Sequence, residues 1–379
     1  MRVAIIHDWL VVYGGAERVL EQMLQVFPDA DIFTLIDFLP SQDRRFLHGK
    51  RVQTSFLQKL PFARRKYRYY LSYMPLAVEQ FDLNSYDLVL SSSSAVAKGV
   101  ITGPDQLHIC VCHSPMRYAW DMQHEYLSEA GIGRGLKTLF VRKVLHDLRL
   151  WDYRTSAGVD HFIAISEHIS RRIWKVYRRE AEVIYPPVDI RSFIPGSTRD
   201  NYYLAVSRFV PYKKMDLIAE AFSQMPDKNL VLIGDGPEMK KIKINSGGNV
   251  KVLGYQTSTE VIRHMQQAKA LVFAALEDFG IVLVEAQACG TPVIAYGRGG
   301  ALESLNGLES DRPTGVFFHR QNASALVDAV MLFEKEVGRF SPDACRQNSL
   351  RFSQERFRQQ FKSFVIAKMT KPKISYKNK

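Results

Sequence analysis

Short apolar runs alternate with segments of helical periodicity along most of the chain. The runs are apolar on both faces, which is typical of parallel strands that are covered by helices on both sides. In the first half, the strand candidates are RVAIIHDWL (2–10), ADIFTLI (30–36), YDLVLSSS (86–93), QLHICVCHS (106–114) and HFIAISEH (161–168). AERVLEQMLQVF (16–27) has the spacing of an amphipathic helix. This order of strand, turn and helix predicts a doubly wound α/β sheet.

The same alternation starts again after a proline-punctuated segment, EVIYPPVDIRSFIPGSTRD (182–200), which is typical of a linker. The strand candidates that follow are YYLAVSRFV (202–210), NLVLIGDG (229–236), VKVLGY (250–255), ALVFAA (270–275) and PVIAYG (292–297). Helices are predicted over 215–225 and 258–268. With 379 residues, the chain is long enough for two such domains. Because ligands of these sheets bind at the carboxyl ends of the strands, we expect the site in a cleft between the domains.

The composition is that of a folded protein in a reducing compartment. The chain is 46% hydrophobic and 11% aromatic, and no apolar run approaches the roughly eighteen residues of a membrane span. His7 and Asp8 interrupt the apolar stretch at the N-terminus, and no small-residue cleavage site follows. We therefore expect a first strand there and a cytosolic protein. The four cysteines lack the spacing of metal sites and are predicted to be buried, reduced thiols.

One acidic residue is unexpected in its surroundings, LEDFGIVLVEAQACGTPVIA (276–295). If a helix begins at about Gly280, then Ile281, Glu285 and Cys289 lie on one helical face, which is otherwise apolar and should be buried. A carboxylate on such a face costs several kcal/mol unless it is partnered, and two vicinal hydroxyl groups are suitable partners. The pattern therefore indicates a ligand-binding glutamate or, alternatively, one that is bonded to backbone.

Two turns at strand ends offer groups that bind anions, and a third partly matches a nucleotide-binding motif. Gly14 and Gly15 follow the first strand and open a helix, whose N-terminus favours an anion. Arg208 and Lys213 follow the first strand of the second domain, where two cations fit a phosphate or diphosphate. LIGDGPE (232–238) lacks the full G-x-G-x-x-G pattern and the later acid, so a dinucleotide site is not expected.

The sequence also contains a D-x-D triplet, Asp29–Ala30–Asp31. Such triplets bind a metal in some enzymes, but this one lies at the amino end of the second predicted strand, away from the expected ligand edge. We predict no metal site there.

The chain is strongly basic, with a net charge of +12. The charge is concentrated in KLPFARRKYRYYLSYMPL (59–76), which has five basic residues among aromatic ones and no acid, in RRIWKVYRR (171–179), and in the tail (368–379). Basic residues interleaved with aromatic rings suit an anionic membrane surface or single-stranded nucleic acid. A solvated helix that covers its own core is the alternative.

Taken together, these motifs resemble a known family. From end to end the chain resembles retaining glycosyltransferases of the GT-B type, family 4, which have two Rossmann-like domains facing each other across a cleft. The resemblance rests on Gly14–Gly15, His113 after ICVC, Arg208 with Lys213, GDGPE, and above all Glu277-x7-Glu285. CHSPMRYAWD (112–121) with HDWLVVYGGAER (7–18) is similar to GDP-mannose-dependent transferases of O-antigen and exopolysaccharide synthesis.

The resemblance implies the domain organisation in more detail. An N-terminal acceptor domain is expected over 1–184, a linker over 185–198 and a nucleotide-sugar domain over 199–351. Residues 352–379 are expected to form a helix that packs back on the N-terminal domain, followed by the basic tail.

The resemblance also assigns roles on the donor side. The second glutamate of the pair, Glu285, accepts hydrogen bonds from the nucleotide ribose, and Glu277 with the main-chain N–H groups after it holds the transferred sugar. Arg208, Lys213 and the Gly15 amide oppose the charge of the leaving diphosphate. The expected nucleotide-sugar site comprises Gly14, Gly15, Arg208, Lys213, Gly234, Tyr255, Glu277, Phe279, Gly280, Ile281, Val282 and Glu285.

The resemblance implies a front-side, same-face transfer of a hexose, and we expect this hexose to be mannose from GDP-mannose, transferred without a cofactor or metal. His113 resembles the family's histidine near the sugar. The expected catalytic residues are His113, Arg208, Lys213 and Glu277.

On the acceptor side, we expect Tyr118 and Trp120 to face a lipid-linked oligosaccharide. The enzyme would then be bound peripherally to the inner face of the cell membrane, with no nucleic-acid partner. The membrane-facing cations would be Arg64, Arg65, Lys66 and Arg68.

Other functions fit parts of the pattern. They are a transferase that uses UDP-glucose or a similar donor, a phosphorylase or synthase on the same scaffold, a non-catalytic basic protein that binds membranes or nucleic acid, and a dehydrogenase. The chain also departs from the family at two places. The linker reads YPPVD where an Asn-Gly turn is usual, and Lys214 stands where a glycine is common.

Overall fold

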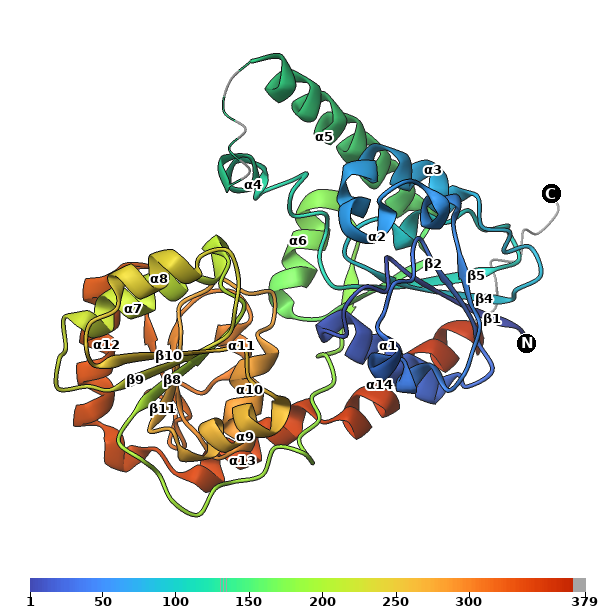
Figure 1. Cartoon of the computed structure of the whole chain (residues 1–379). Coiled ribbons are helices and arrows are strands. Elements are labelled where there is room, and N and C mark those ends of the chain that lie inside the picture. Colours follow the sequence, from blue (N-terminus) through green and yellow to red (C-terminus); the bar gives the residue numbers. More distant parts are fainter. Residues whose placement is uncertain (130, 132, 134, 371–379) are drawn as a thin grey trace. The chain divides into compact units, whose positions relative to one another are not determined.

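The computed structural model describes residues 1–129, 131, 133 and 135–370. Two compact units are present (Figure 1). The first consists of Met1–Pro187 together with the segment from Glu355 onward, and the second of Val188–Gln354. The chain thus crosses into the second unit within the predicted linker and leaves it at the start of the last helix.

The first unit is built on a seven-stranded sheet in the order β3-β2-β1-β4-β5-β6-β7. Every neighbouring pair is parallel. β1 and β4 are buried along their whole length, as their continuous apolar runs predict. The strands are β1 (Val3–His7), β2 (Asp31–Thr34), β3 (Val52–Thr54), β4 (Leu88–Ser93), β5 (Leu107–Cys112), β6 (His161–Ala164) and β7 (Ala181–Val183).

Helices of very different length belong to this unit. They are α1 (Gly15–Val26), α2 (Ala63–Lys66), α3 (Met74–Glu79), α4 (Gln123–Glu129), α5 (Leu136–Thr155), α6 (Glu167–Tyr177) and α14 (Gln354–Thr370). The last of these returns to the first unit, where Phe361 packs edge to face against Phe27 at 6.1 Å between ring centroids. Arg358 of α14 also donates a hydrogen bond to Gln22 of α1.

The second unit is built on a six-stranded parallel sheet in the order β10-β9-β8-β11-β12-β13. The strands are β8 (Tyr203–Val206), β9 (Leu230–Ile233), β10 (Val250–Gly254), β11 (Ala270–Phe273), β12 (Val293–Tyr296) and β13 (Gly315–Phe318). The helices are α7 (Met215–Ser223), α8 (Met239–Asn245), α9 (Ser258–Gln267), α10 (Ile281–Ala288), α11 (Ala301–Ser304), α12 (Ala323–Lys335) and α13 (Pro342–Ser349). Apolar residues of α7 and α12 form one core cluster with the sheet.

The linker belongs structurally to the second unit. Val188 donates its N–H to the carbonyl of Phe352 at 2.8 Å. Arg346 of α13 donates to the carbonyls of Ile190 and Phe193 at 2.8 and 2.6 Å. These bonds satisfy backbone groups that the proline-rich sequence cannot satisfy by pairing in a strand.

The two parallel α/β sheets confirm the predicted fold class. The strands that the pattern did not show are β3, β7 and β13. β3 and β7 have three residues each and no continuous buried run, so their sequences contain no apolar signal. Within the described part of the chain, no helix has both the length and the apolar character that crossing a membrane requires.

Candidate functional site

In each sheet, the strand order reverses at one position. In the second unit, β8 lies between β9 and β11, so that the chain runs outward in one direction from β8 and in the other from β11. The loops that follow these two strands diverge and leave a crevice at their carboxyl ends, the usual ligand position in such sheets. The predicted donor-site residues Arg208, Lys213 and Glu277 lie in these two loops.

The structure brings Lys213 and Glu277 into direct contact. The Lys213 ammonium forms an ion pair with Glu277 Oε1, although 64 positions separate the two residues in the chain. Their side chains are 17% and 15% exposed, so the pair is shielded but still reached by solvent.

The backbone of Glu277 is fixed by a glycine turn. Its carbonyl accepts the N–H of Gly300 at 2.9 Å, and it forms an isolated bridge with Gly299. Gly299 has φ +65°, and a Cβ there would lie 2.3 Å from the Glu277 carbonyl oxygen. Only glycine meets both demands, the left-handed conformation and the close approach.

The second predicted cation, Arg208, contacts the same tyrosine as Lys213, whose ammonium lies 5.5 Å from the centroid of the Tyr212 ring. Arg208 is exposed and donates to the Tyr212 hydroxyl at 2.7 Å. Lys214, which stands where the family often has glycine, adopts φ +55° and ψ +33°. The left-handed conformation explains the preference for glycine, and lysine adopts it here at some cost in strain.

Helix α10 begins at Ile281, directly after Glu277–Gly280. Its N-cap is Gly280, with φ +85° and no side-chain cap. A left-handed glycine that supplies no capping oxygen leaves the positive end of the helix to be satisfied by another group, such as a ligand anion. Phe279 is buried against Phe352, with 5.3 Å between ring centroids.

Glu285 is buried, with 8% of its surface exposed, which confirms the burial predicted from the sequence. The prediction of a single buried stripe is wrong, however, because α10 is buried on all sides from Leu283 onward, including Gln287. The Gln287 amide donates to the carbonyls of Leu283 and Ser304 at 3.1 and 2.9 Å. Burial, and then the charge of Glu285, raises the pKa of the Cys289 thiol to about 12, which keeps that thiol protonated.

Glycines also shape the loop after β9. Gly234 has φ +144°, and a Cβ there would lie 1.7 Å from the carbonyl oxygen of Ser207 in the loop after β8. The loops after β8 and β9 can therefore approach each other this closely only because residue 234 is glycine. Tyr255, predicted to line the nucleotide site, follows β10 and is 80% exposed.

The first sheet reverses between β1 and β4, and a buried polar network occupies that edge. His7 ends β1, Ser92 lies in β4, His113 follows β5, and Glu17 lies in the first turn of α1. Ser92 Oγ lies 2.8 Å from His113 Nε2 and 3.1 Å from His7 Nδ1, and His7 Nε2 lies 3.3 Å from Glu17 Oε1. Burial, and then the nearby His7, lowers the pKa of His113 to about 3, so the ring is neutral.

In the Gly14–Gly15 turn, the N–H of Gly14 already has a partner within the chain. The Gly14 N–H donates to Glu17 Oε2 at 2.9 Å, which closes the N-terminus of α1 with a carboxylate. Gly14 has φ −128°, so its conformation is not left-handed. Gly15 begins the helix.

Trp120, predicted to face the acceptor, has its indole N–H engaged inside the first unit. It donates to Asp152 Oδ2 at 2.7 Å, and Tyr177 donates to the same oxygen at 2.8 Å. The buried ammonium of Lys98 pairs with Asp152 Oδ1. The hydroxyl of Tyr118 is buried, and no partner for it is found among the described residues.

The predicted membrane-facing cations lie on an exposed surface. Arg64, Arg65, Lys66 and Arg68 are exposed on α2 and the turn after it. The neighbouring rings of Phe62 and Tyr69 are 76% and 78% exposed. These six residues, here called the basic-aromatic patch, therefore combine positive charge with apolar rings that protrude into solvent.

One aspartate of the D-x-D triplet, Asp31, has polar partners within the first unit. Asp31 accepts a hydrogen bond from the Tyr86 hydroxyl at 2.8 Å and lies 3.5 Å from the Arg2 guanidinium. Within the described residues, no group of three or more histidine, cysteine or acidic side chains is arranged to hold a metal ion.

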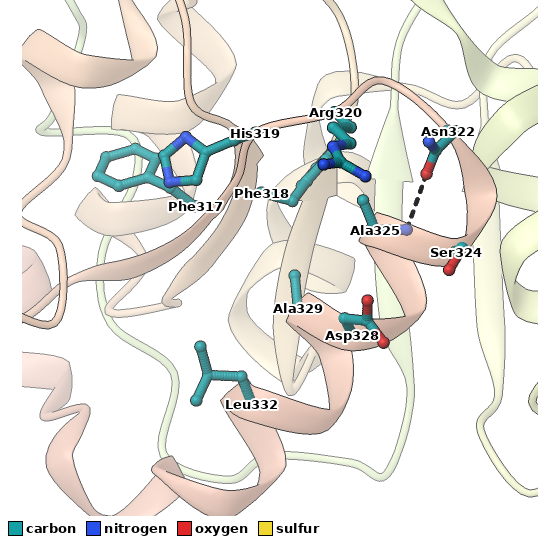
Figure 2. A pocket seen from close by; sticks show the side chains of 10 residues that line it. All are labelled: Phe317, Phe318, His319, Arg320, Asn322, Ser324, Ala325, Asp328, Ala329 and Leu332. Carbon is teal, nitrogen blue, oxygen red and sulfur yellow. Dashed lines mark hydrogen bonds between the residues drawn. The ribbon is translucent and has the colours of Figure 1, made fainter.

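A recess of about 340 Å³ lies at the outer edge of the second sheet, between the end of β13 and α12 (Figure 2). In the strand order, β12 separates it from the β8–β11 reversal. One of its polar groups, Asn322, is committed to capping α12 through the Ala325 N–H at 2.9 Å. Its other polar lining residues are His319, Arg320, Ser324 and Asp328.

Two protein-family models match the chain in succession. Residues 13–192 match Glycosyltransferase Family 4, and residues 189–349 match Glycosyl transferases group 1. A crystal structure of Anabaena Alr3699/HepE in complex with UDP has the same fold, with a TM-score of 0.69 and 17% identity over 97% of this chain and 100% of that chain. The two domains are therefore those of a glycosyltransferase with the GT-B fold, of group 1 and family 4.

Curated relatives match over part of the chain. An uncharacterised glycosyltransferase of Methanocaldococcus jannaschii is 30% identical over 187 residues, which cover 47% of this chain and 52% of the relative. A GDP-mannose-dependent monoacylated α-(1-6)-phosphatidylinositol monomannoside mannosyltransferase of Corynebacterium glutamicum is 29% identical over 178 residues, which cover 39% of this chain and 47% of the relative. The chain thus spans about half the length of the curated relatives it matches.

Proposed function

We propose that the protein transfers a hexosyl group from a nucleotide sugar to an acceptor, with retention of the anomeric configuration. The observation that carries this proposal is the arrangement at the β8–β11 edge. There the Lys213–Glu277 ion pair lies in the loops that lead into α10, and the buried Glu285 lies on that helix. The match of residues 189–349 to group 1 glycosyltransferases supports it.

The groups at this edge suit a nucleotide sugar. The diphosphate would bind Lys213, Arg208 and the positive end of α10, which oppose the charge that grows as the bond to the sugar breaks. Release of Lys213 toward the diphosphate would free the Glu277 carboxylate to accept hydrogen bonds from sugar hydroxyl groups. Glu285, already desolvated, would accept two hydrogen bonds from the ribose diol.

We propose GDP-mannose as the donor. The sequence similarity of CHSPMRYAWD and HDWLVVYGGAER supports it, and so does the GDP-mannose-dependent relative from Corynebacterium glutamicum. UDP-glucose is the alternative, since the Anabaena protein of the same fold was crystallised with UDP.

The experiment is a comparison of GDP-mannose, GDP-glucose, UDP-glucose and UDP-galactose, with release of nucleoside diphosphate and the anomeric configuration of the product as the readouts. Retention with GDP-mannose supports the proposal. Full activity with UDP-glucose and none with GDP-mannose would overturn the donor, and an inverted product would overturn the mechanism. Assays in EDTA should keep full activity, because the predicted chemistry needs no metal.

We propose a polyprenyl-diphosphate-linked oligosaccharide as the acceptor, reached by reversible binding of the basic-aromatic patch to anionic lipid at the inner face of the cell membrane. Four cations at about 1 kcal/mol each provide electrostatic attraction near such a surface. Phe62 and Tyr69 are exposed and free to enter the interface.

The test is co-sedimentation with vesicles that contain phosphatidylglycerol, at low and high salt. Replacing the four patch cations (Arg64, Arg65, Lys66 and Arg68) by serine should release the protein and leave its affinity for GDP unchanged. The matched control removes four exposed lysines from the second unit (Lys240, Lys243, Lys251 and Lys335). Equal loss in both variants would show that only net charge matters, and equal binding by parent and patch variant would refute the surface assignment.

A further inference from the structure

The polar network of the first unit joins four side chains in one line, Glu17–His7–Ser92–His113. All four are buried, and they come from α1, β1, β4 and the loop after β5. Such a line needs each hydroxyl and each neutral ring to donate at one end and to accept at the other. The state of one end therefore determines the state of the other.

Glu17 determines which atoms along the line donate hydrogen bonds and which accept them. Burial raises the pKa of this carboxyl group, but hydrogen bonds from His7 and from the Gly14 N–H hold it below its usual value. An ionised carboxylate only accepts hydrogen bonds. One oxygen accepts from Gly14, so the other must accept from His7, and His7 Nε2 must carry a proton.

Ser92 carries the same donor-to-acceptor order on to His113. With the proton of a neutral imidazole ring on Nε2, the other nitrogen of His7, Nδ1, acts only as a hydrogen-bond acceptor. The Ser92 hydroxyl must then donate to His7 Nδ1 and accept from His113 Nε2, at 3.1 and 2.8 Å. His113 thus carries its proton on Nε2, and its Nδ1 is a bare acceptor. No hydrogen bond to that nitrogen is found within the described part of the chain.

We propose that Glu17, His7 and Ser92 are positioning residues that set the tautomer of His113, so that its Nδ1 accepts a hydrogen bond from a hydroxyl group of the glycosyl substrate. The glycosyl substrate rests on the proposed function, whereas the tautomer does not. An acceptor nitrogen at this position favours hydroxyl groups and repels carboxylate and phosphate oxygens, which have no proton to donate. The hydrogen-bonded line from Glu17 to His113, here called the relay, would therefore favour binding of a neutral sugar over an acidic or phosphorylated one.

The most direct test is Glu17→Gln. The Gly14 N–H still requires an oxygen, so the new amide nitrogen faces His7 Nε2 and must donate to it. Every bond in the line then reverses, and His113 carries its proton on Nδ1. The two ring nitrogens of a neutral histidine differ widely in ¹⁵N chemical shift, so spectra of histidine-labelled protein identify the bare nitrogen, with His113→Asn as the assignment variant.

Two serines on the same strand give a matched pair of controls. Ser92→Ala breaks the line and should leave His113 as a mixture of tautomers. Ser91→Ala removes an equally buried serine–histidine hydrogen bond, to His108 at 2.8 Å, outside the line. It should change neither the His113 spectrum nor turnover, even if it lowers stability.

The expected results are a bare Nδ1 in the parent, a bare Nε2 in Glu17→Gln, and a kcat for glycosyl transfer about tenfold lower or more in that variant, the equivalent of one lost hydrogen bond. A proton on Nδ1 in the parent, or the same tautomer in both proteins, would overturn the relay. If Glu17→Gln inverts the His113 tautomer but leaves kcat unchanged, the tautomer has no role in glycosyl transfer. If no nucleotide sugar is a substrate, the proposed function fails, while the spectra still decide the relay.

Discussion

The two sheet edges of this protein have the same topology but opposite electrostatics. At the β1–β4 edge, the ring of His113 is neutral, and the polar side chains are buried and hydrogen-bonded to one another through Ser92. At the β8–β11 edge, Lys213 and Glu277 are charged and partly exposed, and they flank a helix that has no side-chain cap. A neutral, pre-oriented edge suits recognition of hydroxyl groups, whereas a charged edge suits a diphosphate.

The same contrast separates two ion pairs. Lys98–Asp152 is fully buried in the first unit and is satisfied further by Trp120 and Tyr177. The side chains of Lys213 and Glu277 are 17% and 15% exposed, so this pair is only partly buried. A buried pair is fixed because breaking it leaves an unpaired charge in the interior, while a solvent-reached pair can exchange partners when a ligand arrives. We therefore expect the first pair to serve stability and the second to serve binding.

The largest effect is expected for Glu285→Ala. Loss of two charge-assisted hydrogen bonds, at about 1.5–3 kcal/mol each, should weaken donor binding by roughly two to four orders of magnitude. Calorimetric titration with GDP measures this change. The matched control is Glu334→Gln, which neutralises a carboxylate elsewhere in the unit, 2.7 Å from Lys269, and should leave GDP binding unchanged. A folded Glu285→Ala protein that binds GDP as the parent does would remove Glu285 from the site.

Asp152→Ala should destabilise the first unit by about 3–5 kcal/mol, because it leaves the Lys98 ammonium buried and unpaired. All four tryptophans of the chain lie in residues 9–174, so tryptophan fluorescence during urea unfolding reports on this unit. The control on the same helix is Lys143→Ala, which breaks an exposed pair with Asp147 and should cost at most about 1 kcal/mol. Similar losses in the two variants would contradict the distinction drawn between buried and exposed pairs.

His108 predicts a pH dependence of the first unit. Burial lowers its pKa from 6.5 to about 4, with smaller opposing effects of Gly158 and Asp160. The unfolded chain therefore binds more protons between these values, so stability is fully present above about pH 6.5 and is lost as the pH falls toward 4, by about 3 kcal/mol for this group.

The measurement is the urea midpoint of the fluorescence transition as a function of pH. His108→Gln removes the titrating ring and should make the acid loss shallower, with His113 still contributing. If the urea midpoint of His108→Gln depends on pH as steeply as that of the parent, the ring of His108 has the same pKa in the folded and unfolded states.

A smaller effect is expected for Lys213→Ala and Arg208→Ala. Both should lower kcat by about ten- to a hundredfold, because the diphosphate charge that they oppose grows toward the transition state. Steady-state kinetics with GDP-mannose separate kcat from KM. A change confined to KM would show that these cations hold only the ground state.

The sequence predicted most of the fold, because parallel strands buried on both faces appear as apolar runs whatever their order in space. It also predicted that Glu285 is buried. It did not show the Lys213–Glu277 pairing or the line from Glu17 to His113, because partners that are 64 or 85 positions apart leave no periodic signal. It also did not show that Glu17 binds the Gly14 N–H, because that contact depends on side-chain geometry rather than on composition.

Hydrogen–deuterium exchange with and without GDP tests the central claim, that the donor binds at the β8–β11 edge. Bound ligand slows exchange where it orders or covers backbone amides. The account predicts slower exchange in peptides that span 207–215 and 277–285, and no change in those that span 317–332 around the recess of Figure 2. Protection confined to 317–332, or to the first unit alone, would contradict it.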